Sequence, residues 1–122
     1  MEPQVKDAFD SYPEDARVLL TEIRQLIFDV AEDENIAEIQ ETLKWGEPAY
    51  LSKPGSTLRI DWKAQRPEQV SLFLNCNTKL VQTFKEAYPG TFQFVGNREL
   101  ALPMSESIPM IELRSCISLC LR

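Results

Sequence analysis

The chain has 122 residues, of which 43% are hydrophobic and 26% are charged. This length and balance predict one globular domain over residues 1–122, large enough to bury a core without a metal or a disulfide. The net charge is −6, and residues 1–47 hold thirteen acidic against four basic side chains. Such an acidic surface argues against sequence-independent binding of the whole domain to nucleic acid.

Two absences narrow the expected function. The sequence has no apolar run near the ~20 residues of a membrane span, and its start lacks a basic and then apolar signal pattern, which predicts a cytoplasmic protein without a membrane role. It also has no histidine, the commonest general base and transition-metal ligand. Because a nucleophile elbow, a phosphate loop and spaced metal ligands are also missing, we expect a protein that is not an enzyme.

The first part of the chain has helical periodicity. A short helix is predicted to open at Pro3 and to end near Asp10, and a long helix begins after Pro13. Apolar residues at helical spacing form the inner faces of these two helices: Val5, Ala8 and Phe9, and then Ala16, Leu19, Leu20, Ile23, Leu26, Ile27 and Val30.

A third, shorter helix is predicted between Asn35 and Leu43. Asn35 and Glu38 have the spacing of a capping arrangement, and Ile36, Ile39 and Leu43 would form the inner face. The outer face of this helix would be acidic.

A change from helical to strand character is expected after this third helix. Gly46 can take the positive φ that ends a helix, and Pro48 prevents the helix from restarting, so a strand should open at Ala49. Trp45 and Tyr50 would then flank a tight corner. These two rings either plug the joint between helix and sheet or line a concave binding site.

Strand patterns dominate the rest of the chain. Gly96-Asn97 has glycine where a two-residue type II′ hairpin turn requires it, and Pro54-Gly55 suits the centre of a turn. Asn77 is expected to cap a helix over residues 80–88, and Ser105 is expected to cap the last helix. The expected strands are 49–52, 58–63, 70–74, 92–95 and 98–102.

The order of elements is therefore α-α-α-β-β-β-α-β-β-α, without repeats or linkers. It predicts an α+β fold with an antiparallel sheet of about five strands and helices packed on one face. The open face would leave one set of alternating side chains available to a small molecule, a protein partner or a second copy of the chain. These side chains are Arg59, Asp61, Lys63, Ser71 and Phe73. Both a monomer and a homodimer are compatible with this pattern.

The cysteines indicate reduced thiols. Three cysteines without CxxC spacing do not suit a disulfide framework. Cys116 and Cys120 share one helical face with Leu113 and Ile117, which favours buried, inert thiols over a soft-metal or redox site. Cys76 has no histidine to activate it as a nucleophile.

Two candidate binding sites follow from the residues. Carboxylates that crowd the end of the long helix and the third helix can hold Ca²⁺, Mg²⁺ or Fe²⁺ or a basic partner, or can simply be a solvated face. They are Asp29, Glu32, Asp33, Glu38 and Glu41. The alternative site combines the aromatic corner with cations of the outer strand face, and suits an anionic small molecule or peptide: Lys44, Trp45, Tyr50, Arg59 and Lys63.

Three segments together resemble a known family. The segments are Phe9-Asp10-Ser11-Tyr12-Pro13-Glu14, Lys44-Trp45-Gly46-Glu47-Pro48-Ala49-Tyr50 and Val70-Ser71-Leu72-Phe73. With the intervening pattern, they make nearly the whole chain similar to the YdhG-like family of small domains of unknown function. Many relatives have a histidine where this chain has Gln69, so a ligand or proton role of that position does not carry over.

The resemblance implies a fold and a function. The family has helix-backed antiparallel sheets, and it includes a protein described as a frataxin-like intracellular iron chaperone. It therefore implies a non-enzymatic carrier that binds Fe²⁺ weakly on surface carboxylates, here the acidic set given above. A binding module that uses the Lys44–Tyr50 corner and the outer sheet face is the competing hypothesis.

Overall fold

A computed structural model describes residues 1–36, 38–53, 55–74 and 79–122. In these residues the chain forms four helices and six strands. The helices are α1 (Pro3–Asp10), α2 (Glu14–Asp33), α3 (Leu80–Ala87) and α4 (Met110–Leu121). The strands are β1 (Gln40–Lys44), β2 (Glu47–Leu51), β3 (Leu58–Asp61), β4 (Gln69–Leu74), β5 (Gln93–Val95) and β6 (Glu99–Pro103).

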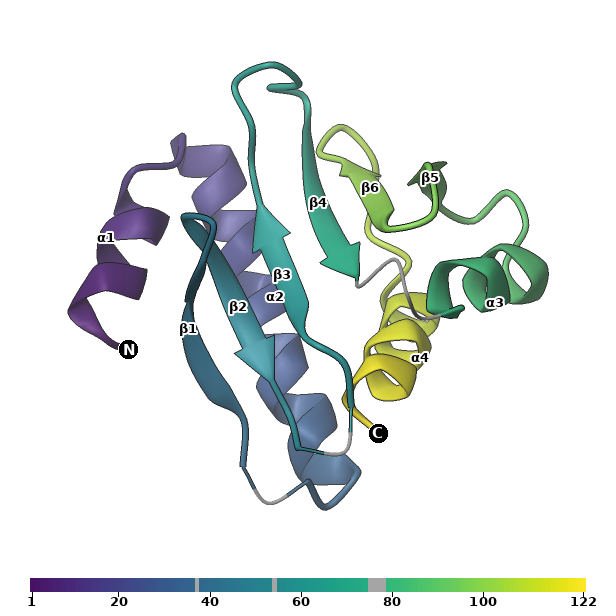
Figure 1. Cartoon of the computed structure of the whole chain (residues 1–122). Coiled ribbons are helices and arrows are strands. Elements are labelled where there is room, and N and C mark those ends of the chain that lie inside the picture. Colours follow the sequence, from purple (N-terminus) through teal and green to yellow (C-terminus); the bar gives the residue numbers. More distant parts are fainter. Residues whose placement is uncertain (37, 54, 75–78) are drawn as a thin grey trace.

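The six strands make one sheet in the order β1-β2-β3-β4-β6-β5. Every neighbouring pair is antiparallel. Figure 1 shows α2 behind the sheet, α1 beside β1, and α3 and α4 at the opposite side of the molecule. The prediction of an α+β fold with an antiparallel sheet is confirmed, with one strand more and one helix fewer than expected.

The core lies between the sheet and the helices. The 3.6-residue period of α2 buries one face of this helix, including Leu20, Ile23 and Ile27. Alternation along β3 and β4 directs every second side chain toward that face. The strand residues buried there include Leu58, Ile60, Val70, Leu72, Leu74, Leu100 and Leu102.

The helix predicted between Asn35 and Leu43 is wrong. Asn35 has a positive φ of 56°, and the chain then enters β1, which begins at Gln40. The spacing of Ile36, Ile39 and Leu43 is compatible with one face of a helix. In the structure, each of these residues packs against the core from a loop or a strand. Tertiary packing thus overrode a weak local pattern.

The corner predicted around Gly46 is instead the tip of the β1–β2 hairpin. Lys44 pairs with Glu47, so Trp45 and Gly46 form a two-residue loop. Their φ values are 57° and 75°, and positive φ at both centres is what a type I′ turn requires. Gly46 therefore takes the expected positive φ, but it connects two strands and does not end a helix.

One predicted turn and one predicted helix cap are wrong. Val95 pairs with Glu99, so the β5–β6 loop has three residues, and the predicted two-residue turn at Gly96-Asn97 is wrong. Ser105 does not cap α4, because this helix begins at Met110 after Pro109. The predicted Asn77 cap and Cys76 lie outside the described residues.

Cys116 and Cys120 are free and buried on the inner side of α4. Burial raises the pKa of the Cys116 thiol to about 12, with a smaller contribution from Glu112, and burial also raises the pKa of Cys120. Both residues are therefore thiols at neutral pH, as expected for inert core cysteines. No helix in the described residues is long and apolar enough to cross a membrane.

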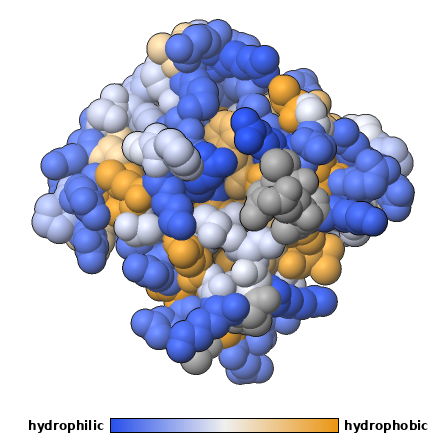
Figure 2. All heavy atoms as spheres, in the orientation of Figure 1, coloured by the Kyte–Doolittle hydropathy of each residue, from blue (hydrophilic) through white to orange (hydrophobic). Residues whose placement is uncertain are grey.

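The outer face of the sheet is open to solvent. In Figure 1 strands β2 and β3 lie in front of α2. Figure 2 shows the same side of the molecule with mostly hydrophilic residues and only small apolar patches between them. An antiparallel sheet with one packed and one solvated face has this division of side chains.

The end of α4 is held by the segment between β2 and β3. The backbone N–H of Ser56 donates to the Cys120 carbonyl at 2.8 Å, and the Ser52 hydroxyl donates to the Leu121 carbonyl at 2.7 Å. These bonds satisfy carbonyls that have no partner within the helix. Gly55 packs so closely here that a Cβ would lie 2.2 Å from the Cys120 carbonyl oxygen.

We expect Gly55→Ala to lower the free energy of unfolding by about 1–3 kcal/mol, because the added methyl group meets backbone that cannot move independently. Urea unfolding followed by circular dichroism measures this change. Ser56→Ala is the control, because it keeps the backbone N–H that binds Cys120. Equal stability of the two variants would contradict the close approach.

Candidate functional site

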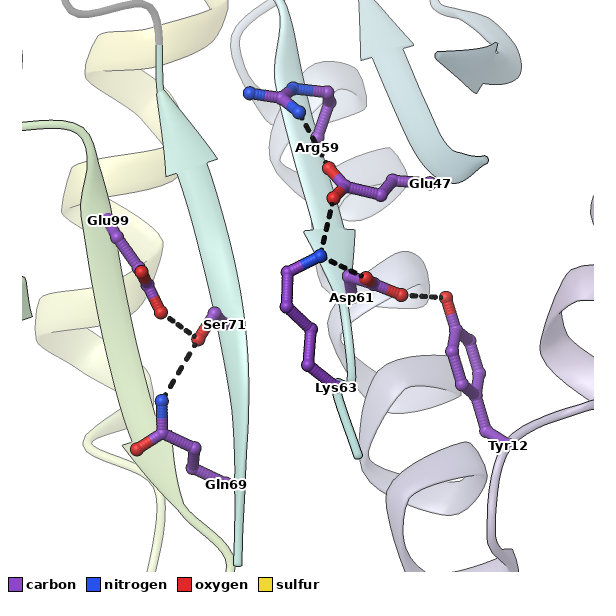
Figure 3. Close-up of polar contacts among 8 residues, drawn as sticks. All are labelled: Tyr12, Glu47, Arg59, Asp61, Lys63, Gln69, Ser71 and Glu99. Carbon is purple, nitrogen blue, oxygen red and sulfur yellow. Dashed lines mark hydrogen bonds and ion pairs between the residues drawn. The ribbon is translucent and has the colours of Figure 1, made fainter. Parts of the chain in front are cut away.

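Two hydrogen-bonded groups of polar side chains occupy the outer face of β2, β3, β4 and β6. Strand alternation turns Arg59 and Asp61 of β3 away from the core, on the side opposite Leu58 and Ile60. The same alternation exposes one side-chain row of each neighbouring strand to this face. Figure 3 shows the resulting side chains together with Tyr12, which reaches Asp61 from the connection between α1 and α2: Glu47, Arg59, Asp61, Lys63, Gln69, Ser71 and Glu99.

Glu47 is the centre of the first half of this set. One carboxylate oxygen accepts a hydrogen bond from Arg59 Nη1 at 2.7 Å and the other accepts from Lys63 Nζ at 2.9 Å. The side chain of Glu47 is only 9% exposed. A carboxylate with so little access to water needs such partners, so both cations are engaged in compensating its charge.

Lys63 extends the chain of contacts to Asp61 and Tyr12. Lys63 Nζ donates to Asp61 at 3.0 Å, and the Tyr12 hydroxyl donates to the other oxygen of Asp61 at 2.5 Å. Burial acts to lower the pKa of Lys63, but the hydrogen bonds to Glu47 and Asp61 outweigh it and leave the pKa raised. Burial and then the bond to Asp61 raise the pKa of Tyr12, which stays a neutral donor.

Phe73 provides the apolar floor below these cations. The Arg59 guanidinium carbon and Lys63 Nζ each lie 5.4 Å from the centre of the ring. Both distances suit cation–π attraction, and Phe73 itself is only 8% exposed. The ring therefore contacts both cations on the outer face of the sheet.

The second half of the set lies on β4 and β6. The Ser71 hydroxyl donates to Glu99 at 2.7 Å, and the Gln69 amide nitrogen lies 3.4 Å from the Ser71 oxygen. Gln69 and Ser71 are buried, whereas Glu99 is half-buried. Glu99 makes no ion pair within the described residues, so Ser71 is its only protein donor there.

A hollow of about 340 Å³ separates Lys63 from Glu99. This volume is at the lower end of the range for small-molecule sites. Exposed Arg66 stands at its rim, and its side chain makes no ion pair with another described residue. The lining is Lys63, Gln65, Arg66, Gln69, Ser71 and Glu99, so groups of both charges face one small space.

The residues of the predicted corner site do not lie together in the structure. Arg59 and Lys63 lie together on the outer face, and the paired position of Lys44 opposite Glu47 places Lys44 on the same face. Tyr50 is fully buried on the inner face, as the plug interpretation predicted. Trp45 is 91% exposed at the hairpin tip, so the plug interpretation is wrong for this ring.

The predicted acidic set is also divided. Glu41 faces α2, where Arg24 donates to it from Nε at 2.5 Å and from Nη2 at 3.0 Å, and where the Tyr50 hydroxyl donates at 2.8 Å. Burial acts to raise the pKa of Glu41, but these hydrogen bonds outweigh it and leave the pKa lowered. Glu41 is therefore a structural ion-pair partner on the inner side of the hairpin.

The other four acidic residues do not form a common site. Asp33 pairs with Arg114, and Asp29 accepts a hydrogen bond from Gln25. Glu38 lies in the segment before β1 and lines a different hollow. Within the described residues no three acidic or cysteine side chains are grouped closely enough to hold a metal ion. Iron binding remains a prediction of the family resemblance.

Sequence reasoning identified the cations of the outer face but missed several of their partners. Glu47 was assigned to the corner, and Tyr12 and Glu99 were not assigned to a site. Alternation from Arg59 and Ser71 was the usable signal for the face, because it places every second residue of a strand on one side. The pairings themselves depend on strand order, which local patterns do not provide.

Comparison of the chain with family models, curated proteins and solved structures finds no significant match. The likeness to the YdhG-like family thus stays a prediction.

We expect Glu41→Gln to lower the free energy of unfolding at pH 7 by about 1–3 kcal/mol, because Arg24 loses its charged partner. A lowered folded-state pKa stabilises the fold above the unfolded-state pKa, near 4.3, and that contribution disappears as the pH falls through the folded-state value. Denaturant unfolding at pH 7 and at pH 3 measures both effects. Exposed Glu38→Gln is the control; matching pH profiles for the two variants would refute this role.

The iron prediction has a separate test. Anaerobic calorimetric titration of the reduced protein with Fe²⁺, Mg²⁺ and Ca²⁺ should give saturable heat with a preference for Fe²⁺. The combined variant Asp29→Asn, Glu32→Gln, Asp33→Asn and Glu38→Gln should lose it, while Glu41 is kept because it supports the fold. Equal weak heats for all three ions, or an unchanged titration of the variant, would rule out this carrier function.

Proposed function

We propose that the chain is a non-enzymatic binding protein whose outer sheet face holds a small zwitterionic molecule. The observation that carries the proposal is the hollow of about 340 Å³ whose lining includes the basic side chains of Lys63 and Arg66 and the carboxylate of Glu99. A ligand with an anionic group and an ammonium group complements both kinds of charge. The volume of the hollow limits the ligand to the size of an amino acid or a phosphorylated amino alcohol.

The existing ion pairs decide which groups are available to the ligand. Lys63 already donates to Glu47 and Asp61, so it contributes mainly a fixed positive field. Arg66 has a planar set of donors that suits a carboxylate or a phosphate. Glu99 receives one hydrogen bond from Ser71 and retains acceptor sites for an ammonium group. We therefore assign the anionic end of the ligand to Arg66 and the cationic end to Glu99.

Buried supporting residues favour a preformed site. Gln69 and Ser71 are both on β4, in the middle of the sheet order, and their side chains make contacts within the face. A site built on paired strands keeps its geometry better than one built on loops. Preorganisation reduces the entropy lost on binding, so even a few polar contacts give measurable affinity.

The absence of histidine from the sequence supports a non-enzymatic role. Two carboxylates of the face, Glu47 and Asp61, already accept hydrogen bonds from Arg59, Lys63 and Tyr12, so their oxygens are engaged within the protein. Turnover of a bound ligand would contradict this part of the proposal.

The test is a ligand titration followed by two-dimensional amide NMR. The panel contains small amino acids and phosphoethanolamine, with N-acetyl and methyl-ester derivatives that lack one charge. We expect zwitterions to shift the signals of the hollow and each derivative to bind at least about tenfold more weakly, because one charge-assisted hydrogen bond is lost.

Matched variants locate the two ends of the ligand. Arg66→Gln should remove the preference for a free anionic group, and Glu99→Gln should remove the preference for a free ammonium group. Exposed Arg98→Gln and Glu22→Gln change the net charge equally and should have no effect. If no panel member shifts the hollow, or if the control variants weaken binding as much, the proposal fails.

A further inference from the structure

Ser71 connects the side chains of Gln69 and Glu99 within the lining of the hollow beside Lys63. Its hydroxyl donates to the Glu99 carboxylate at 2.7 Å, and the Gln69 amide nitrogen lies 3.4 Å from its oxygen. Figure 3 shows Ser71 between the other two side chains. Because Gln69 and Ser71 are on β4 and Glu99 is on the neighbouring β6, paired strands hold the three groups together.

These three side chains retain several hydrogen-bond acceptor sites. A carboxylate has about four such sites, and a hydroxyl or an amide oxygen has two. The Ser71 hydroxyl occupies one site of Glu99, and the Gln69 amide nitrogen occupies one site of Ser71. The remaining sites of the carboxylate and of the hydroxyl are available to a donor in the hollow.

The amide oxygen of Gln69 is a further accessible acceptor. Gln69 as a whole is only 9% exposed, and among the described residues every buried polar side-chain atom has a hydrogen-bond partner. The amide of Gln69 contacts Ser71 through its nitrogen, and its oxygen accepts no hydrogen bond from a described side chain. This oxygen is therefore not among the buried atoms. A mostly buried side chain thus contributes an accessible acceptor to the lining of the hollow.

The hollow offers no comparable site for a fully methylated ammonium group. Such a group has no N–H to donate, and proteins bind it over aromatic rings. No aromatic ring is among the described lining residues. Phe73, on the same outer face, is 8% exposed and already has the Arg59 guanidinium carbon and Lys63 Nζ at 5.4 Å from its ring centre. Its ring is therefore already covered by two cations of the protein.

We propose that the hollow selects a primary ammonium group over its methylated forms, with Glu99, Ser71 and Gln69 as the acceptors of its three N–H groups. This inference rests on the zwitterionic ligand of the proposed function and specifies which ammonium group that ligand carries. Glu99 supplies the charge, and Ser71 and Gln69 supply neutral acceptors that a methyl group cannot use. The ligand class is an unmethylated amino acid or a phosphorylated primary amine, as opposed to a betaine or phosphocholine.

Hydrogen bonds distinguish these ligands where charge does not. A primary ammonium and its trimethyl form have the same charge, so both are attracted to Glu99. Methylation replaces the N–H donors and leaves acceptors of the lining without partners. A site built to hydrogen-bond a polar N–H rejects an analogue that lacks it much more strongly than an apolar pocket rejects one methyl group.

A methylation series of one amino acid tests the selectivity. Glycine and its N-methyl, N,N-dimethyl and N,N,N-trimethyl forms keep both charges at pH 7 and lose one N–H donor at each step. We expect the affinity, measured by amide NMR titration, to fall at each step and to be at least about tenfold lower for trimethylglycine than for glycine. Alanine is the size control, because its extra methyl group is on carbon and its ammonium stays primary.

Two variants separate the neutral acceptors from the charge. Ser71→Ala and Gln69→Met each remove one acceptor and keep Glu99, so each should lower the preference for glycine over trimethylglycine by about threefold or more. A purely structural effect would weaken both ligands equally and leave this ratio unchanged. Ser115→Ala is the matched control, because Ser115 is on α4 and lines a different hollow.

The outcomes separate this inference from the proposed function. If trimethylglycine binds as tightly as glycine and both still require Arg66 and Glu99, the hollow binds zwitterions without selecting a primary ammonium, and this inference is wrong. An unchanged ratio in both Ser71→Ala and Gln69→Met would also overturn it. If no member of the series shifts the signals of the hollow, the proposed function fails and this inference fails with it.

Discussion

The two-residue turn at Trp45-Gly46 is the constraint on which both faces of the sheet depend. Its length fixes the pairing of Lys44 with Glu47, and with it every other pair of the β1–β2 hairpin. Because side chains alternate along a strand, a shift of one residue would exchange the two faces. If β1 were shifted by one residue against β2, Glu41 would face solvent, away from Arg24 and the Tyr50 hydroxyl. The positive φ of both turn residues therefore sets the register of the hairpin, and the register places Glu41 and Glu47 beside their cationic partners.

The two carboxylates of the hairpin show what this register achieves. Glu41 reaches inward to Arg24 and Tyr50, whereas Glu47 reaches outward to Arg59 and Lys63. Each ion pair joins the hairpin to a different neighbour, the first to α2 and the second to β3 and the segment that follows it. Breaking one partner of such a pair leaves a poorly hydrated charge, which costs more than the pair contributes over apolar residues. The ion pairs therefore enforce one arrangement of the hairpin more than they add stability.

The sequence predicted those parts whose pattern is long or strictly alternating. The apolar period of α2 extends over four turns, which predicted this helix without an alternative, and the alternation around Ile60 identified an outward row of charges. The third helix failed because Ile36, Ile39 and Leu43 match a helical spacing by chance over one short segment. Hydrogen bonds between residues far apart in the sequence could not be predicted from local patterns. Arg24 is 17 residues from Glu41, and Tyr12 is 49 residues from Asp61. These contacts follow from strand order and helix placement, which only the assembled fold defines.

The charge balance of the outer face explains why a zwitterion suits it better than a simple anion. Arg59 and Lys63 are matched by Glu47 and Asp61, so the centre of the face has no net charge to attract an anion. A ligand that displaced either cation would leave a carboxylate unpaired, and this cost opposes binding at the centre. At the hollow next to Lys63 the two charges that remain without an ion pair among the described residues, Arg66 and Glu99, are opposite in sign. A ligand with both charges satisfies each of them without breaking an existing ion pair, and an anion alone satisfies only one.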